Sequence, residues 1–170
     1  VSLRAQAAGD VHRWVGGLLE NHDDGGLHTL AGRLRVAGFP IYVTRDLEAA
    51  KGYARDRFGH EPDRRFGLLA SSKAKNLARY GLNSDFQATK RIRIGNWFND
   101  GIESQRSCCR LEDVITEFQC QGLELDLPIV AWGDDFTWSG DVWTIPTTRK
   151  QRLVRDPMRL RTNAYRVLLS

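Results

Sequence analysis

The sequence predicts an α/β domain built on a mainly parallel sheet, and three observations lead to this fold class. Short apolar segments of strand character alternate along the chain with segments whose apolar residues recur at helical spacing. The segment 66–71 is an apolar run closed by Ser71, a pattern typical of a strand buried on both faces. The chain has 170 residues, of which 41% are hydrophobic and 27% charged, and this is enough to bury one core.

The expected elements follow one another in the order that such a sheet requires. Helical periodicity or composition, with Asp10 as the first N-cap, indicates helices at 10–20, 27–36, 46–58, 72–79 and 159–169. Composition and apolar patterning indicate strands at 39–44, 66–71, 113–118, 127–132 and 141–145. Residues 83–110 are polar and contain Gly and Asn, so we expect an insertion or irregular excursion from the sheet. We expect residues 1–170 to be one domain of a longer protein, because the chain begins with Val and stops abruptly.

Composition limits the possible function classes. A net charge of +4 permits contact with nucleic acid. Seven basic residues and one acidic residue lie in 147–166, which indicates either a strip that tracks phosphates or a solvated loop. No apolar run approaches the roughly 20 residues that cross a bilayer, and the first residues lack the charged-then-apolar pattern typical of a signal peptide. The three cysteines lack metal-ligand spacing, so we expect reduced thiols in a cytoplasmic protein without membrane contact.

A short polar segment carries the most specific chemical signal. Gln121, Gly122 and Glu124 follow the strand predicted at 113–118, on the side of a parallel sheet where ligands bind. A glycine lets the backbone approach a phosphate, a glutamine can donate to phosphate or nucleic acid, and a carboxylate can accept from ribose hydroxyls. A plain glycine turn between two strands has the same pattern, so the residues alone leave both interpretations open.

Residues 116–126 have the pattern Thr-x-x-x-x-Gln-Gly-x-Glu-x-Asp and are followed by an apolar strand. This pattern resembles motif V of superfamily 1 helicases. The resemblance implies that Thr116 approaches nucleic acid, Gly122 approaches the γ-phosphate and Glu124 holds the nucleotide sugar, with Gln121 linking them. Phe118 stands where that family often has a histidine, which puts this particular nucleic-acid contact in doubt.

Residues 163–170 resemble the start of motif VI, in which a tyrosine-containing helix leads into Leu-Ser/Thr-Arg. The arginine of that motif stabilises charge on the transferred phosphoryl group. This sequence stops at Ser170, one residue before that arginine, and Arg166 lies one helical turn too early to take the role. We therefore expect no catalytic residue within the chain.

The spacing of the two motifs, with Gly-Leu-Glu-Leu-Asp before the strand at 127–132, is similar to the Schlafen-like bacterial helicase-domain family. That resemblance covers about the last two thirds of the chain. It implies a three-layer RecA-like domain of the P-loop NTPase type, the second domain of a DNA or RNA helicase or translocase. A weaker match to motif IV leads us to expect Ser71 and Ser72 in contact with nucleic acid.

The loop Gly-x-x-x-x-Gly-Lys-Ser/Thr, which cradles phosphates in such proteins, does not occur in the sequence. We expect ATP and Mg²⁺ to bind the longer protein, between this domain and its N-terminal RecA-like domain. The isolated chain is expected to bind neither cofactor and to hydrolyse no ATP. The alternative function is a non-catalytic RecA-like module that binds nucleic acid or protein.

Other residues suggest further sites. We expect Trp97, which has polar neighbours, to stack on the bases of DNA or RNA, and Trp132 to lie in the core. A metal site could be built from His22, Asp23, Asp24 and His28, although this segment has the composition of a polar turn. A Mg²⁺-dependent nuclease could be built from Asp134, Asp135 and Asp141. We rank both below the helicase interpretation and expect no metal ligand in the chain.

Overall fold

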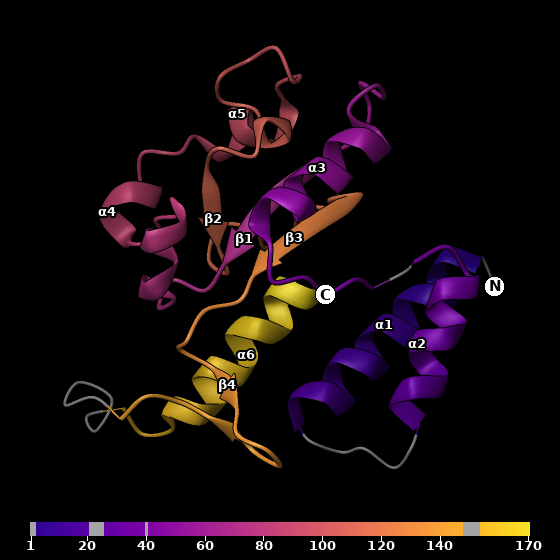
Figure 1. The fold of residues 1–170 in the computed structure, drawn as a ribbon, viewed down its shortest axis with the longest axis vertical. Coiled ribbons are helices and arrows are strands. Elements are labelled where there is room, and N and C mark those ends of the chain that lie inside the picture. The colour runs from indigo at the N-terminus through magenta and orange to yellow at the C-terminus, as the bar shows by residue number, and fades with distance from the viewer. Residues whose placement is uncertain (1–2, 21–25, 40, 148–153) are drawn as a thin grey trace.

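The computed structural model describes residues 3–20, 26–39, 41–147 and 154–170, which form an α/β fold around a parallel sheet (Figure 1). The three strands lie in the order β2–β1–β3, with bounds Val114–Thr116, Phe66–Ala70 and Leu127–Ala131. Leu68 of the central strand lies opposite Val114 on one side and Ile129 on the other. All five residues of β1 are buried, which confirms the strand predicted from its apolar run.

The described ranges contain four longer helices and four short helical segments. The longer helices are α1 (Leu3–Glu20), α2 (Gly26–Val36), α3 (Leu47–Phe58) and α6 (Pro157–Leu169). The short segments are α4 (Phe86–Thr89), α5 (Ile94–Asn99) and the 3₁₀ turns η1 (Lys75–Tyr80) and η2 (Cys108–Arg110). Two predicted helix starts have clear causes, since the Asp46 carboxylate accepts from the N–H groups of Glu48 and Ala49, and Asp156 caps α6.

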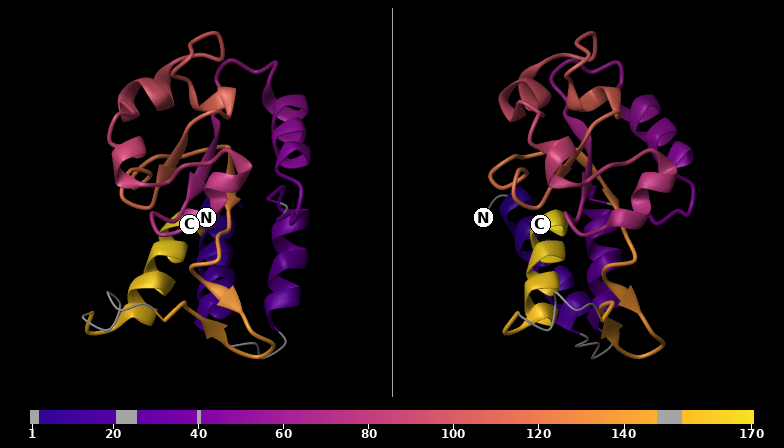
Figure 2. Two further views of the ribbon diagram at one scale, coloured as in Figure 1. Left: turned by 60° about the vertical axis from the view of Figure 1, so that its left-hand side comes forward. Right: turned by 90° about the vertical axis from the view of Figure 1, so that its left-hand side faces the viewer.

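The helices are divided between the two ends of the molecule. Helices α1, α2 and α6 gather at one end, and α3 and α5 lie at the other (Figures 1 and 2). Helix α1 packs against both α2 and α6, and α3 packs against β3. The Trp143 indole N–H donates to the carbonyl of Leu18 at 2.8 Å, and Arg166 pairs with Glu20 at 2.5 Å. These contacts join α1 to the C-terminal part of the chain.

Two predictions for the N-terminal part of the chain are wrong: the strand at 39–44 and the N-cap at Asp10. The strand predicted at 39–44 is not formed: residues 41–44 have no regular secondary structure and pair with no strand in the described part of the chain, and Tyr42 and Val43 are exposed. Their β-branched and aromatic residues favour a strand only where a neighbouring strand offers partners. Asp10 is not an N-cap, because α1 already begins at Leu3 and Asp10 instead pairs with Arg13 within the helix.

The extended piece predicted at 141–145 does not join the parallel sheet. Its strand β5 (Trp143–Thr144) pairs antiparallel with β4 (Thr137–Trp138) in a separate hairpin. The Trp143 ring of this hairpin stacks on Phe136 and on Trp132, with ring centroids 4.5 and 5.4 Å apart. The hairpin is therefore held by an aromatic cluster at the end of β3 rather than by a sheet edge.

The segment 83–110 covers one face of the central strand. Trp97 of α5 is fully buried and lies directly against Gly67, where an added Cβ would stand 2.6 Å from the ring atom Cη2. Its indole N–H points to the carbonyl of Asp113 at 3.4 Å. The expectation that Trp97 stacks on nucleic-acid bases is therefore wrong. Its polar sequence neighbours conceal the fact that Gly67 leaves a slot on the strand for a large ring.

The three cysteines are free thiols and all are buried. The Sγ atoms of Cys108 and Cys109 are 3.9 Å apart. Burial raises the pKa of Cys120 to about 11, so this thiol stays protonated at neutral pH. Cys108 and Cys109 pack beneath the sheet as part of the core.

Candidate functional site

Polar residues follow each strand of the parallel sheet at the edge where the strands end. Ser71 and Ser72 follow β1, Glu117 follows β2, and Gly133 and Asp135 come shortly after β3. Because parallel strands end at one edge, these residues are brought together from three distant parts of the sequence. We call this group the carboxyl edge.

A buried carboxylate is the centre of the carboxyl edge. Asp135 is 5% exposed, and its Oδ2 accepts from the Ser71 hydroxyl at 2.6 Å. Its Oδ1 accepts from the Tyr165 hydroxyl at 2.8 Å. The guanidinium of Arg161 forms an ion pair with Oδ2 at 3.2 Å, and its Nη1 donates to Ser71 Oγ at 2.9 Å. This network joins β1 and the end of β3 to helix α6.

Tyr165 fixes α6 to the edge a second time. Its hydroxyl oxygen accepts from the N–H of Gly133 at 3.2 Å, and its ring stacks on Trp132 with centroids 4.1 Å apart. Burial raises the pKa of Tyr165 well above its usual value, and the nearby charge of Asp135 raises it further. The phenol is therefore a neutral donor to Asp135 at physiological pH.

The raised pKa of Tyr165 predicts a loss of stability in alkali. The unfolded phenol titrates near pH 10, whereas the buried phenol keeps its proton, so folding is favoured fully below pH 10. Above that value we expect the free energy of unfolding to fall by about 1.4 kcal/mol per pH unit through this group. Urea unfolding from pH 8 to 11 would measure it. Tyr165→Phe should lack this part of the slope, and an equal slope in both proteins would contradict the assignment.

A second buried carboxylate joins the ends of β1 and β2. Glu117 is 5% exposed and accepts from the N–H and the hydroxyl of Ser72, both at 2.8 Å. Two residues later, Gln119 accepts from the N–H and hydroxyl of Thr116 and donates to the carbonyl of Thr89 at 3.0 Å. The turn after β2 is thus fastened to β1 on one side and to α4 on the other.

Three of the residues expected at a ligand lie in the connection from β2 to β3. Gln121, Gly122 and Glu124 are all exposed, and Gly122 has φ +81°, which favours glycine. A Cβ built on Gly122 would meet nothing within 4 Å, so its backbone is open to an approaching group. Their roles in binding nucleotide stay predictions.

The residues expected to contact nucleic acid are mostly enclosed. Ser71 is fully buried, and its hydroxyl donates to Asp135 while accepting from Arg161, so the expectation for Ser71 is wrong. Thr116 is 3% exposed and bonded to Gln119, which likewise closes it to a direct contact. Ser72 is half-buried with its N–H and hydroxyl bound to Glu117, and its role stays a prediction. The sequence does not show that neighbouring strands supply partners for these hydroxyls.

The other candidate sites receive no support from the geometry. No group of three His, Cys, Asp or Glu side chains that could hold a metal occurs in the described ranges. Asp135 faces Arg161 while Asp134 is exposed, so they do not form the carboxylate cluster of a nuclease. Three of the residues considered for the first metal site, His22, Asp23 and Asp24, lie outside the described residues, as do Arg149, Lys150 and Arg152 of the basic strip.

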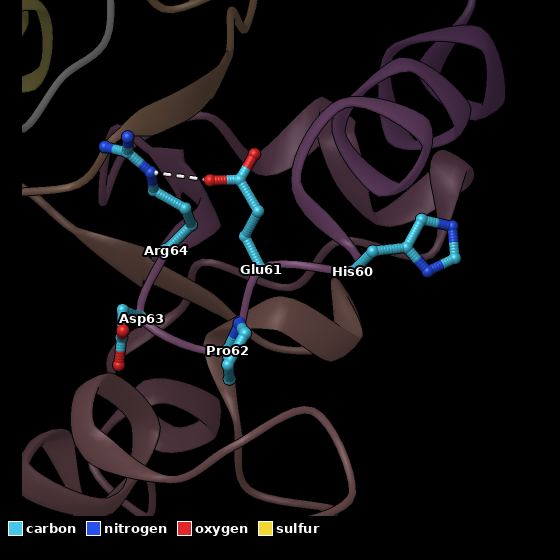
Figure 3. A pocket seen from close by; sticks show the side chains of 5 residues that line it. All are labelled: His60, Glu61, Pro62, Asp63 and Arg64. Carbon is cyan, nitrogen blue, oxygen red and sulfur yellow. Dashed lines mark hydrogen bonds and ion pairs between the residues drawn. The ribbon is translucent and has the colours of Figure 1, made fainter.

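A surface hollow of about 410 Å³ lies in the connection from α3 to β1, before the amino end of that strand. It is lined by His60, Glu61, Pro62, Asp63 and Arg64 (Figure 3). Glu61 and Arg64 pair with each other at 3.1 Å, while the His60 ring points away from them (Figure 3). Since these side chains do not converge on a common point, the carboxyl edge is the better candidate site.

Residues that sequence reasoning missed hold the carboxyl edge together. Glu117, Asp135 and Arg161 form the hydrogen bonds and the ion pair that join its segments, and none was expected to take part in a helicase site. For Asp135 a signal was present, because it is a carboxylate placed just after the strand predicted at 127–132, whereas Glu117 lies within the strand predicted at 113–118. For Arg161 there was none, since its side chain is one of many arginines near the C-terminus.

Comparison with known families gives one match. The family profile described as "Schlafen group 3, DNA/RNA helicase domain" matches residues 1–170. No curated protein and no solved structure shows significant similarity to the chain. None of the helices in the described ranges is long and apolar enough to cross a membrane. Because the profile spans all of the sequence, the chain belongs to the Schlafen group 3 DNA/RNA helicase domain family.

Proposed function

We propose that this chain is the second, C-terminal RecA-like domain of a superfamily 1-type helicase or nucleic-acid translocase. One observation carries the proposal: the segment resembling motif V begins at the carboxyl edge, at the end of β2, and the segment resembling motif VI is bound to the same edge beyond β3. Thr116 is the last residue of β2, and Tyr165 ties α6 to Gly133 and Asp135 beyond β3. Membership of a helicase-domain family supports the same function.

In this proposal, ATP lies between the N-terminal RecA-like domain and the turn that carries Gly122. The open backbone of Gly122 fits the approach of a phosphate, because no atom stands within 4 Å of where a side chain would begin. Gln121 can donate its amide to a phosphate oxygen, and the Glu124 carboxylate can accept from a ribose hydroxyl. ATP supplies the phosphoryl group when bound, and the ligands of Mg²⁺ belong to the other domain.

The buried network gives this domain the rigidity that closure over a nucleotide requires. Asp135, Ser71, Arg161 and Tyr165 join the sheet to α6 through charged and neutral hydrogen bonds in a largely buried site. A movement of the turn after β2 is therefore shared by α6, which leads toward motif VI. The chain's own contribution is to position groups and not to perform the cleavage.

Substitutions in the exposed turn test this proposal in a longer protein that also contains the phosphate-binding loop. We expect Glu124→Ala to lower nucleic-acid-stimulated kcat/KM for ATP by about 10- to 100-fold, because a hydrogen bond to a charged group contributes about 1.5–3 kcal/mol. Gly122→Val should be at least as damaging, because the side chain blocks the phosphate and strains a positive φ. Steady-state ATP hydrolysis with saturating oligonucleotide measures both effects.

Matched variants separate binding from folding. Glu112→Ala removes another exposed glutamate, paired only with Arg110, and should leave ATP hydrolysis unchanged. Gly122→Asn tolerates a positive φ yet still adds a side chain, so it should lower ATP hydrolysis without a loss of stability. ATP hydrolysis that survives Glu124→Ala and Gly122→Val unchanged would refute the assigned site. The isolated chain is expected to be inactive.

A further inference from the structure

A strongly basic segment follows β1. Residues 73–93 contain six basic residues and one acidic residue, a net charge of +5, whereas the whole chain has a net charge of +4. All six basic side chains are exposed, and none forms an ion pair with a carboxylate in the described part of the chain. They are Lys73, Lys75, Arg79, Lys90, Arg91 and Arg93. Such unpaired cations attract a polyanion.

Exposed aromatic rings lie among these cations. Tyr80 is 54% exposed, and Phe86 and Phe118 are each 73% exposed. The Arg79 guanidinium stands 4.9 Å from the centre of the Tyr80 ring, and the Lys90 amine stands 5.8 Å from that of Phe86. Rings flanked by cations offer a base both a stacking surface and a nearby partner for its phosphate.

Phe118 is held in place by both of its sequence neighbours. Glu117 before it is buried and bound to the N–H and hydroxyl of Ser72. Gln119 after it is bound to Thr116 and to the Thr89 carbonyl. The exposed phenyl ring therefore projects from a backbone that is held on both sides. A platform that is already ordered loses little entropy when a ligand stacks on it.

Phe86 lies on the element to which this turn is fastened. Helix α4, which begins at Phe86, packs beside β2 (Figure 1), and Thr89 at its end accepts from Gln119. The segment η1 begins at Lys75, shortly after β1 ends at Ala70, so its first residue lies near the same edge of the sheet, and Tyr80 is the last residue of η1. We call the exposed surface of η1, α4 and Phe118 the aromatic–basic face.

We propose that the aromatic–basic face binds a single strand of DNA or RNA, with bases stacked on Phe118 and Phe86 and phosphates held by the neighbouring lysines and arginines. This inference rests on the proposed function, since it identifies the surface by which the proposed motor domain contacts the nucleic-acid strand. It replaces the contacts expected of Ser71, Thr116 and Trp97, which the fold encloses. A single strand is the fitting partner because the base faces of a duplex are already stacked on one another.

Anisotropy of fluorescein-labelled dT20 and U20, titrated with the 170-residue chain, tests the proposal. Phe118→Ala and Phe86→Ala should each weaken binding by about 5- to 150-fold, the effect of losing one stacked base. The matched control Tyr42→Ala removes a ring that is 67% exposed outside this face and should leave binding unchanged. Both phenylalanines are exposed, so thermal unfolding of the variants should match that of the parent chain.

Salt dependence tests the cations separately. The double variant Lys90→Ala/Arg91→Ala should lower the slope of log affinity against log salt by about 1 to 2. The matched pair Arg33→Ala/Arg35→Ala on α2 should not change it. Tighter binding of dT20 or of U20 supports the proposal and identifies the sugar that the face prefers.

Three results would overturn the proposal: no binding of either oligonucleotide, binding that Phe118→Ala and Phe86→Ala leave intact, or equal affinity for a 20-base-pair duplex. None of these results touches the effect of Glu124→Ala on ATP hydrolysis. Failure of the aromatic–basic face can therefore be told apart from failure of the helicase assignment.

Discussion

Replacing Asp135 by alanine is expected to lower the free energy of unfolding by about 3–5 kcal/mol. The substitution leaves Arg161, whose side chain is 12% exposed, without its carboxylate, and an unpaired buried charge is strongly destabilising. It also removes the acceptor of the Ser71 and Tyr165 hydroxyls. Since domains of this size are stable by only about 5–15 kcal/mol, the variant should be close to unfolding at ambient temperature.

Urea denaturation followed by circular dichroism measures this effect, and the neighbouring residue provides its control. Asp134 is exposed, so Asp134→Ala should change stability by no more than about 0.5 kcal/mol. The double variant Asp135→Ala/Arg161→Met should regain part of the loss, because the unpaired charge is gone. If Asp135→Ala proved as mild as Asp134→Ala, the network would not be what joins α6 to the sheet.

Replacing Trp97 by alanine is expected to cost about 3–5 kcal/mol, the range for removing a large buried ring. Trp97 is fully buried and fills the space above Gly67, so its loss leaves a cavity against the central strand. Thermal or urea unfolding measures the cost. A loss below about 1 kcal/mol would mean that α5 does not pack on β1 in the manner described.

The reverse substitution tests the same contact from the other side. Gly67→Ala places a Cβ 2.6 Å from Trp97 Cη2 and should destabilise the chain by about 1–3 kcal/mol. Trp97→Phe removes the obstructing atoms, so the double variant should be more stable than the sum of the single effects predicts. Gly95→Ala is the control, because a Cβ there meets nothing within 4 Å and alanine favours a helix. Strict additivity of the two substitutions would contradict the contact.

Much of the fold follows from local patterns in the sequence. The apolar run at β1 and the helical spacing of apolar residues at 46–58 predict their elements, because burial of a strand on both faces or of a helix on one face leaves a pattern in adjacent residues. The segment 41–44 was mispredicted because strand formation depends on a partner that no local pattern reveals. Trp97 was misjudged for a related reason, since the glycine that accommodates it lies thirty positions earlier in the sequence.

The candidate site was located more reliably than its residues were assigned. Strand-ending segments can be recognised in the sequence, and the structure brings Ser71, Glu117 and Asp135 to one edge. Which of them face solvent depends on hydrogen bonds to other segments, and Ser71 is enclosed by its bonds to Asp135 and Arg161. Thr116 is likewise buried and is bonded to Gln119 in the turn that follows it. Phe118 shows the opposite effect. Because Phe118 replaces the histidine that the family often has, there was less reason in the sequence to expect a nucleic-acid contact there. In the structure, Phe118 and Phe86 are the two most exposed rings of the aromatic–basic face.

The two fastenings of the turn after β2 have a mechanical consequence. A force on Phe118 is transmitted along two sets of hydrogen bonds. Glu117 is bound to Ser72 at the end of β1, and Gln119 is bound to Thr89 of α4. Because hydrogen bonds hold both neighbours of Phe118, we expect a force on its ring to move the turn together with the ends of β1 and α4. Tyr165 joins α6 to the same edge through Asp135, so in the proposed motor we expect a force from a bound strand to reach α6.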